Sequence, residues 1–558
     1  MLVAMSGRVL IRVGSAYKSG CIPLPIFSLD FFSFTMRTSP FVFKFGVLIH
    51  LVFARLVRGD YHWPSPLIDQ LEGLLYEGKQ EGLPDRAVDF VAQLNGCIPR
   101  DNNESIAAEW IRFAYHDMAT HNVDDGTGGL DNSISSELDR AENVGGGMQR
   151  ARFDFIDFPN KYVSYSDVIA MGVVLATVEC GGPIIAYRGG RIDAMFAGPP
   201  GVPTPEQPVE DFIETFRKQG FTQEEMIGLV ACGHTLGGVH NPDFETLVPP
   251  GDIPFEDNIE LFDGTPQFDN AIVTQYLNGS TNNLLVAGPN GNETLSSDLR
   301  VFSSDGNVTM QSLASPQNFA ATCATLLGRM IDTVPRNVTL TDFINPLPVK
   351  VAGVQLAAGA DGNLVLNLTM RLLSNTARQV TLHWTDRDST VCSSGFCSAT
   401  PINSTLIKTP LLGALELAPI KYTFSTPIAN TSIGTFWFEI DGRIENNGGS
   451  GYAIEQDRVL FSPDRSSFVF GGVQAFKIVA AVRNDSIPSV VYINTYQRSV
   501  TVVRSPSINL TLDASIPSAA GYDFYSAQVP GSDLSFDLFA EIDGKTYEEE
   551  FRDTHFIA

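Results

Sequence analysis

The chain lacks the features that mark nucleic-acid-binding or disordered proteins. Its 37 Lys and Arg face 63 Asp and Glu, and a formal net charge of -26 disfavours binding to nucleic acid or to an anionic membrane surface. Only 18% of its residues are charged while 44% are hydrophobic, so no long stretch has the composition of a disordered segment. Its 558 residues predict two to four folded domains, at roughly 100 to 200 residues per domain.

A hydrophobic run long enough to span a bilayer is not evident. The run at 41–53, FVFKFGVLIHLVF, has 13 residues and suits the core of a signal peptide. Arg37 supplies the positive flank if synthesis starts at Met36, and cleavage near Gly59 would leave a chain free of the membrane. We therefore expect residues 1–59 to be a gene-model extension plus a signal peptide. The alternative is a buried segment or a signal anchor.

Cysteine is sparse, and no C-x-x-C pair of the metal-binding type occurs. Beyond Cys21 there are six cysteines, an even number that fits disulfides in an oxidising compartment: Cys97, Cys180, Cys232, Cys323, Cys392 and Cys397. The last two are expected to close a small loop. Ten N-x-[ST] sequons are present: Asn103, Asn278, Asn292, Asn307, Asn337, Asn367, Asn403, Asn430, Asn484 and Asn509. These features predict a secreted, extracellular glycoprotein.

The hydrophobic pattern divides the chain in two. Helical periodicity predicts helices near 68–77, 85–94, 105–119, 165–178, 209–218, 223–232, 270–277 and 316–331. Capping boxes mark two of the starts, Ser164 with Asp167 and Thr222 with Glu225. After the proline-marked stretch 334–350, short alternating β-branched and aromatic runs predict strands.

The C-terminal half repeats itself. The stretch from Tyr422 resembles the stretch from Tyr522, and both contain EIDG, at 439–442 and 541–544. A period near 100 residues predicts two sandwiches of immunoglobulin-like or fibronectin-like type. The alternative is one larger β domain. We expect a multidomain protein with a mainly α-helical domain at 60–340, β-sandwich module 1 at 345–450 and β-sandwich module 2 at 451–558.

Two residues of the segment WIRFAYHD carry a specific chemistry. Arg112 and His116 are four residues apart, so on a helix both side chains project from one face. Cleavage of a peroxide needs a base that moves a proton between two oxygens and a fixed cation that stabilises the developing negative charge. Imidazole and guanidinium meet that need, although an exposed helix face is the ordinary explanation for this spacing alone.

Three further residues add to that pair. His234 stands at the end of an amphipathic helix, and a neutral imidazole is a natural haem-iron ligand. Asp298, in LSSDLRVF, could accept the other ring N–H of His234, and the Asn143 amide could hold the ring tautomer of His116. The ordinary alternatives are a Ser-Asp turn for Asp298 and a Gly-rich turn for Asn143.

The order of these motifs resembles the plant, fungal and bacterial haem peroxidase superfamily, particularly its secreted fungal (class II-like) branch. The resemblance spans about 95–335 and includes the segments at 112–117, 128–134, 179–193, 233–237, 262–270 and 296–302. It implies one haem b, with Arg112 and His116 as distal catalytic residues, Asn143 orienting His116, His234 as axial ligand and Asp298 as its partner. Tyr115 takes a position usually held by Phe or Trp.

Two calcium ions follow from the same resemblance, and oxygen donors suit that cation. The distal set matches Asp117, Gly129, Asp131 and Ser133, with an acidic insertion between the first two. The proximal set matches Thr235, Asp263, Thr265, Gln267 and Asp269, with one residue missing before the last. The bridge of Cys97 with Cys180 resembles one of the family, and we pair Cys232 with Cys323 without such support.

The reducing substrate is the least specified feature. Leu229 stands where lignin-oxidising members carry an exposed Trp, and Pro250 stands at the position of the proximal Trp of cytochrome c peroxidases. Of the carboxylates of a manganese site, Glu109 is present, whereas Ser105 and His240 stand in the other two positions.

The expected function is therefore that of a haem peroxidase. It would reduce hydrogen peroxide to water through an oxyferryl intermediate, with one-electron oxidation of small phenolic or similar donors. The β modules leave cell-wall polysaccharide open as a further partner. The alternative is a non-catalytic cell-wall or glycan-binding protein with a degenerate peroxidase scaffold.

Overall fold

The computed structural model describes residues 56–58, 64–78, 97, 105–241, 243–248, 258–289, 292–359, 363–387, 397–429, 431–469, 474–498, 501–531, 535–554 and 557. The hydrophobic run at 41–53, the expected cleavage near Gly59, the helix expected at 85–94, Pro250 and Cys392 lie outside the described residues. None of the helices in the described part of the chain is long and apolar enough to cross a membrane.

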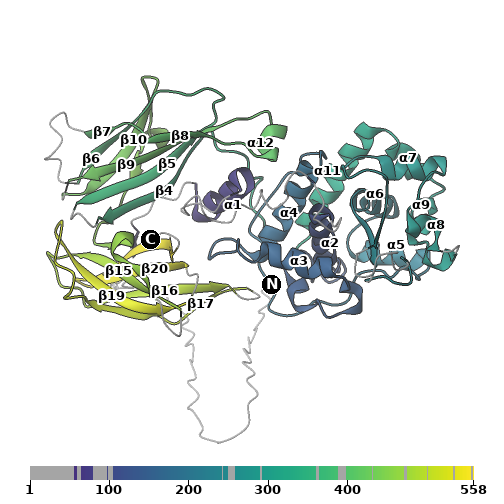
Figure 1. Ribbon diagram of the computed structural model, residues 1–558, viewed down its shortest axis with the longest axis horizontal. Helices are drawn as coiled ribbons and strands as arrows, with labels where there is room; N and C mark the ends of the chain where they lie inside the picture. The colour runs from purple at the N-terminus through teal and green to yellow at the C-terminus, as the bar shows by residue number, and fades with distance from the viewer. Residues whose placement is uncertain are drawn as a thin grey trace, which may run out of the picture. The chain divides into compact units, whose positions relative to one another are not determined.

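Helices make up the first half of the described chain (Figure 1). The helices predicted from periodicity form within two residues of the expected bounds: α1 (Pro66–Glu77), α2 (Ile106–Met118), α4 (Tyr165–Glu179), α5 (Val209–Lys218), α6 (Gln223–Gly233), α7 (Ala271–Asn278) and α11 (Pro316–Asp332). Five short helices were not predicted: α3 (Gly146–Phe155), α8 (Leu284–Ala287), α9 (Ser297–Ser303), α10 (Val308–Leu313) and α12 (Pro410–Ala414). Strands β2 (Gly238–Asn241) and β3 (Asn258–Leu261) pair antiparallel after α6.

One of the two expected capping boxes forms completely, and α4 keeps only the Ser164 half because the Asp167 carboxylate accepts the backbone N–H groups of Gly190 and Arg191. The Ser164 hydroxyl accepts the backbone N–H of Asp167 at the start of α4, and Thr222 with Glu225 forms a reciprocal capping box on α6. Ser105 caps α2 by accepting the backbone N–H of Ala108. These caps fix where the helices that carry the candidate site begin.

The helical core is centred on α4, which is buried around almost all of its circumference. A Cβ added to Gly172 would lie 2.8 Å from the Phe155 ring and 3.3 Å from the Trp110 ring, so α4 packs closely against α2 and α3. Two disulfides fasten this core, Cys97–Cys180 and Cys232–Cys323, with Cα–Cα distances of 4.9 and 5.5 Å. Both expected pairings are present, and the second ties α6 to α11.

Two facing sheets form the first part of the β region. One has the order β4-β5-β9-β8: β4 (Val349–Ala358), β5 (Leu364–Leu372), β9 (Ile420–Ile428) and β8 (Asn403–Leu406). The other has the order β11-β10-β6-β7, with β12 beside β10: β11 (Arg443–Glu445), β10 (Ile433–Ile440), β6 (Val380–Asp386), β7 (Cys397–Ala399) and β12 (Tyr452–Ala453). Leu366 and Phe424 of the first share a buried core with Leu382 and Phe436 of the second.

One ten-stranded sheet forms the second part, in the order β1-β21-β20-β16-β18-β19-β15-β13, with β14 on β15 and β17 on β16. Its members are β1 (Leu56–Arg58), β13 (Val459–Phe461), β14 (Ser467–Val469), β15 (Ala475–Arg483), β16 (Val490–Arg498), β17 (Val502–Arg504), β18 (Ile508–Leu512), β19 (Tyr522–Pro530), β20 (Ser535–Ile542) and β21 (Lys545–Asp553). Strand β18 pairs with β16 and with β19, so the sheet curls around one core into a nearly closed barrel.

The repeated EIDG segments are two equivalent hairpin turns. Asp441 and Gly442 join β10 to β11 with φ of 50° and 78°, and Asp543 and Gly544 join β20 to β21 with φ of 51° and 72°. A two-residue turn with positive φ at both positions favours Asp-Gly, which explains the repeat. The prediction of a helical domain followed by a β region is confirmed. The second module is one nearly closed sheet and not two facing sheets, and the immunoglobulin-like or fibronectin-like type of the first module stays a prediction.

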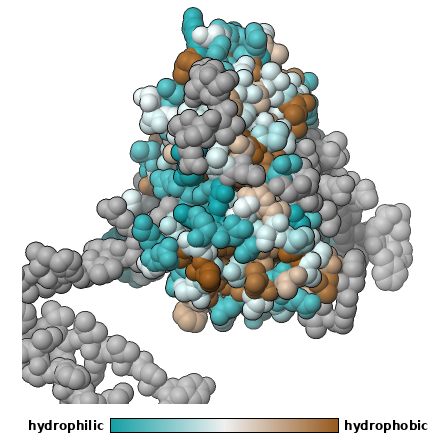
Figure 2. All heavy atoms as spheres, turned by 90° about the vertical axis from the view of Figure 1, so that its left-hand side faces the viewer, coloured by the Kyte–Doolittle hydropathy of each residue, from teal (hydrophilic) through white to brown (hydrophobic). Residues whose placement is uncertain are grey.

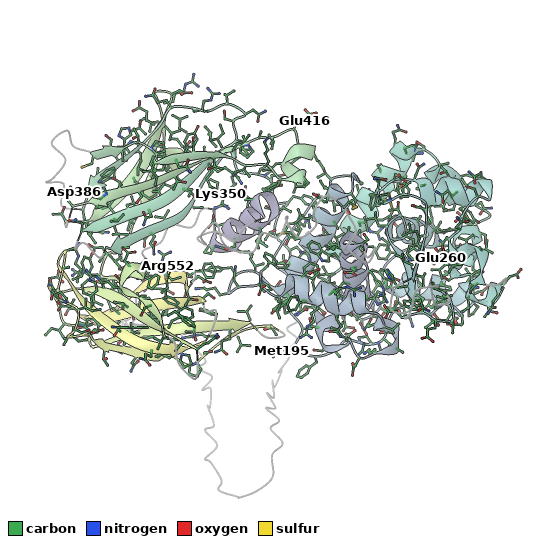
Figure 3. All side chains as sticks on the ribbon, viewed as in Figure 1. Met195, Glu260, Lys350, Asp386, Glu416 and Arg552 are labelled. Carbon is green, nitrogen blue, oxygen red and sulfur yellow. A yellow bond between two sulfur atoms is a disulfide. The ribbon has the colours of Figure 1, made fainter. Side chains whose placement is uncertain are left out.

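Helix α1 contacts the first β region through charged side chains. Lys350 of β4 lies beside α1 (Figure 3), with its Nζ 2.9 Å from Oε2 of Glu72. Arg371 of β5 pairs with Glu72 and with Glu77, its Nη1 lying 3.0 Å from Oε1 of Glu77. On the face of the β region that Figure 2 shows, hydrophobic residues are interspersed among hydrophilic ones.

Candidate active site

A cavity of about 360 Å³ lies between α2 and α6. Arg112 and His116 of α2 line it together with His234 at the end of α6, so residues far apart in the sequence meet there. Most of the remaining lining is apolar and includes Phe212, Phe216, Val230, Leu236, Phe262, Leu327 and Met330. The cavity therefore brings the imidazoles of His116 and His234 and the guanidinium of Arg112 together within a mostly apolar lining, which His240 and Arg150 also join.

His116 is held by Asn143. The His116 Nδ1 lies 2.8 Å from Oδ1 of Asn143, and the Asn143 Nδ2 donates to the Glu137 carbonyl at 2.9 Å. Since the amide oxygen can only accept, the proton belongs on Nδ1 and the lone pair on Nε2. Burial, followed by the nearby charge of Arg112, lowers the pKa of His116 to about 3. His116 is therefore a neutral base at neutral pH.

Arg112 stays cationic although it is buried. Burial lowers its pKa to about 10, against the opposing effect of Asp243 and Glu109. Its Nη2 donates to the Val144 carbonyl at 2.8 Å, and the Phe244 ring centroid lies 5.9 Å from Cζ. Asp243 in turn accepts the backbone N–H of Gly146 at 3.1 Å. Asp243 and Phe244 thus join the Arg112 side of the cavity, and no motif in the sequence indicated them.

Tyr115 packs beside His116. Its ring lies 6.0 Å from the imidazole at 83° and 5.9 Å from the ring of Phe216 at 24°. Burial raises the pKa of the Tyr115 hydroxyl, so the phenol is neutral. Tyr115 lines the cavity, as expected for a residue next to the distal pair.

His234 faces the cavity from the opposite wall. Its Nδ1 lies 2.9 Å from Oδ2 of Asp298, which leaves Nε2 as the other ring nitrogen. The Phe262 ring stacks on the imidazole at 4.3 Å and 12°. Asn283 also reaches Asp298, since its Nδ2 donates to the same Oδ2 at 2.8 Å. The sequence suggested the His234–Asp298 pair but neither Phe262 nor Asn283 as its neighbours.

The distal acidic residues come together at the end of α2. Asp117 accepts the backbone N–H groups of Asn132 and Ile134 at 2.7 and 2.9 Å, and the Ser133 hydroxyl lies 3.4 Å from its Oδ1. Burial, and then the charge of Asp131, raises the pKa of Asp117 well above its usual range. Gly129 lies in the connecting loop, where φ is 124°. Two buried carboxylates therefore lie close enough for the charge of Asp131 to raise the pKa of Asp117.

The second acidic set follows β3. The Thr265 hydroxyl lies 3.2 Å from Oδ1 of Asp263 and 3.2 Å from Oδ2 of Asp269, and the Thr235 hydroxyl donates to the Asp269 carbonyl at 2.6 Å. Burial raises the pKa of Asp263 to about 6, and the charge of Asp269 acts in the same direction. The hydrogen bond from the backbone N–H of Thr265 acts in the opposite direction. Its Oδ2 is buried without a hydrogen-bond partner, whereas Gln267 is exposed. The described residues hold no group of three His, Cys, Asp or Glu around one point.

The residues at the expected tryptophan and manganese-ligand positions, Leu229, Glu109, Ser105 and His240, all line the cavity. Leu229 is buried in α6 with 4% of its surface exposed, so this position presents no side chain to large donors. Glu109 accepts from Arg150, whose Nη2 lies 2.8 Å away. Ser105 caps α2 and His240 lies in β2.

Comparison with known proteins relates the helical domain to peroxidases. Residues 95–315 match the family described as peroxidase. A WSC domain-containing protein of Arthroderma benhamiae is 38% identical over 323 residues, 57% of this chain and 44% of the relative. A mitochondrial cytochrome c peroxidase of Cryptococcus neoformans is 32% identical over 142 residues, 24% of this chain and 37% of the relative. The peroxisomal L-ascorbate peroxidase 5 of Arabidopsis thaliana is 28% identical over 186 residues, 33% of this chain and 62% of the relative.

The chain spans less than two thirds of the length of each of these relatives. The matched residues 95–315 contain Arg112, His116 and His234, whereas the lining residues Leu327 and Met330 and the β region lie beyond them.

Proposed function

From the premise that residues 95–315 form a peroxidase-family domain, we propose that the protein is a haem peroxidase that reduces hydrogen peroxide to water. The observation that supports this proposal most is that Arg112, His116 and His234 line one cavity, with Asn143 bonded to His116 and Asp298 bonded to His234. The electron donors are small phenols or similar molecules, each oxidised by one electron.

The walls of the cavity suit a haem. His234 Nε2 is the ring nitrogen not engaged by Asp298, and a neutral imidazole with its other N–H bonded to a carboxylate is a strong iron ligand. The apolar lining matches a porphyrin face, and Phe262 fixes the plane of the imidazole. Haem would supply the iron that takes oxidising equivalents from peroxide and passes them to donors one electron at a time.

The chain's own residues manage the protons and the charge. His116 Nε2 takes the proton from one peroxide oxygen and returns it to the other, which leaves as water. Arg112 stabilises the negative charge on the departing oxygen, and Asn143 keeps the proton on Nδ1 so that Nε2 stays available. Each turnover consumes one hydrogen peroxide, two electrons and two protons, and yields two water molecules.

Small donors fit the surroundings of the cavity. Leu229 provides no exposed aromatic relay, and Glu109 is already paired with Arg150. These observations favour direct oxidation at the cavity edge over a manganese site or a surface Trp.

Two calcium ions are part of the proposal. The distal ion would take Asp117, Asp131, Ser133 and the Gly129 carbonyl, and the raised pKa of Asp117 supports a cation there. The proximal ion would take Thr235, Asp263, Thr265, Asp269 and the Gln267 carbonyl, and the buried Asp263 Oδ2 without a hydrogen-bond partner supports it.

Secretion, glycosylation and the β modules complete the proposal. The two disulfides fit an oxidising compartment. Of the eight sequon asparagines in the described part of the chain, six are exposed: Asn278, Asn292, Asn337, Asn403, Asn484 and Asn509. We propose a division into 60–340, 345–450 and 451–558, in which 345–450 is a sandwich of immunoglobulin-like or fibronectin-like type and 451–558 is the nearly closed barrel. Wall polysaccharide is the partner that we propose for these β modules.

The axial ligand tests this proposal most simply. His234→Ala should lose the absorption and magnetic signature of histidine-ligated haem iron, because the ring nitrogen is removed. His240→Ala is the matched control, since His240 lines the same cavity from β2 and should leave the signature intact. An unchanged signature in His234→Ala would refute the assignment.

A further inference from the structure

We propose that Asn283 is a positioning residue that limits the negative charge Asp298 imposes on the His234 imidazole. This inference rests on the proposed function, because it concerns the residue assigned as the iron ligand. It assigns a role to a side chain outside every motif discussed above.

The contacts converge on one oxygen atom. Asp298 Oδ2 lies 2.9 Å from His234 Nδ1 and 2.8 Å from Asn283 Nδ2. Asn283 is fully buried and Asp298 is 2% exposed, so water does not compete for this oxygen. The two donors therefore share one acceptor in an apolar setting, where such bonds are strong.

The orientation of Asn283 is fixed by helix α8. Its Oδ1 accepts the backbone N–H of Leu285 at 2.9 Å, and its own backbone N–H donates to the Thr281 hydroxyl at 3.1 Å. With Oδ1 committed to the helix cap, the amide NH₂ is the group that must face Asp298. Phe262 covers the imidazole face but has no N–H, so it cannot provide this second bond.

The second donor weakens the first bond. A carboxylate oxygen that also accepts from a neutral amide is a weaker acceptor for the Nδ1–H of His234, so it adds less electron density to the imidazole ring. Without Asn283, Asp298 would pull the proton more strongly and His234 would become more imidazolate-like. A more anionic ligand favours ferric over ferrous iron and strengthens the iron–nitrogen bond.

Asn283→Ser in the full-length haem-loaded protein tests the inference. Serine still caps α8 but is too short to reach Asp298. We expect a higher iron–histidine stretching frequency in the resonance Raman spectrum of the ferrous protein. We also expect a ferric-to-ferrous ratio raised up to about tenfold at fixed potential, which equals about 59 mV for one electron.

Two controls separate this role from a structural one. Asn160→Ser changes another buried asparagine whose Oδ1 accepts the backbone N–H groups of Tyr162 and Val163, and it should move neither measurement. In an Asp298→Asn background, Asn283→Ser should produce no shift, since the shared carboxylate is gone. If Asn283→Ser does not fold, Asn283→Thr replaces it under the same criteria.

The outcomes are distinct. An unchanged or opposite shift in the folded Asn283→Ser protein, or an equal shift in the Asp298→Asn background, overturns the inference and leaves the peroxidase proposal intact. A parent protein without an iron–histidine band overturns the peroxidase proposal itself, and the inference with it.

Discussion

The imidazoles of His116 and His234 line the same cavity, and the partner of each Nδ1 decides what each ring can do. His116 has a neutral amide oxygen from Asn143, whereas His234 has the carboxylate of Asp298. The amide fixes a tautomer without adding charge, which suits a base. The carboxylate makes the ring more electron-rich, which suits a metal ligand. The same side chain thus takes two roles through contacts outside the ring.

The distal pair should control the reaction with peroxide. Arg112→Leu and His116→Leu are each expected to slow the peroxide reaction by about 10² to 10⁴-fold, because they remove the charge or the base. Rapid mixing with peroxide measures this rate, and haem content should not change. Arg150→Leu, another arginine lining the cavity, should react within a few-fold of the parent. Parent-like rates in both distal variants would exclude this role for the pair.

The pH dependence of the peroxide reaction follows from the burial of His116. Because its pKa is lowered to about 3, the base is neutral above that pH, and the peroxide rate should stay level from about pH 8 to pH 5. A rate that falls already near pH 6.5, the ordinary pKa of histidine, would contradict this prediction.

The same lowered pKa makes stability depend on pH. Between about pH 6.5 and 3 His116 is protonated in the unfolded chain but not in the folded protein, so the free energy of unfolding decreases as pH falls.

At the scale of elements, the sequence predicts those helices whose bounds are set by hydrophobic periodicity and capping residues. Helices α2, α4 and α6 have clear periodicity or capping residues, and they form close to the expected bounds. Helix α3 begins in three glycines and α8 has four residues, so neither had a periodic signal. Asn283 could not be foreseen, because it meets Asp298 only when α8 and α9 pack together. The position of Phe262 on His234 likewise depends on β3, whose pairing with β2 spans a long connection.

The stability of the loops that carry Asp131 and Asp263 should depend on bound calcium. Removing both ions with a chelator is expected to lower the free energy of unfolding by about 5 kcal/mol, at about 2.7 kcal/mol per site, from a starting calcium concentration about 100 times Kd. Thermal unfolding with and without EGTA measures this loss, which Asp131→Asn combined with Asp263→Asn should largely abolish. Asp124→Asn is the control, because Asp124 is an exposed carboxylate of the acidic insertion that pairs with Arg217 of α5. This variant should lose as much stability with EGTA as the parent. Insensitivity of the parent to EGTA would contradict the calcium assignment.

At the scale of the whole molecule, ionic contacts join the helical domain to the β region. The Nζ of Lys161, a residue that follows α3, lies 2.8 Å from Oδ1 of Asp537 and 3.0 Å from Oε1 of Glu550. Glu72 of α1 is fully buried between Lys350 and Arg371, and these two cations hold its pKa below the usual range against the effect of burial. The sequence assigned these elements to separate domains and gave no sign that charges would join them.

Removing Arg371 from its ion pairs with Glu72 and Glu77 of α1 should lower the stability of the protein. Arg371→Met leaves Glu77 and Glu72 short of a buried partner, and we expect a loss of about 3 kcal/mol in the free energy of unfolding by urea. Arg378→Met is the matched control, since Arg378 and Asp441 are nearly half exposed and such pairs contribute about 0 to 1 kcal/mol. Equal losses in the two variants would mean that burial does not set the strength of this contact.

The most direct test of the central claim is the absorption spectrum of the purified full-length protein before and after one equivalent of hydrogen peroxide. The geometry of His116, Arg112 and His234 predicts a Soret band that shifts on addition of peroxide and returns when a small phenol is added. A protein without a Soret band, or one whose band peroxide leaves unchanged, would contradict the assignment of this cavity to peroxide reduction.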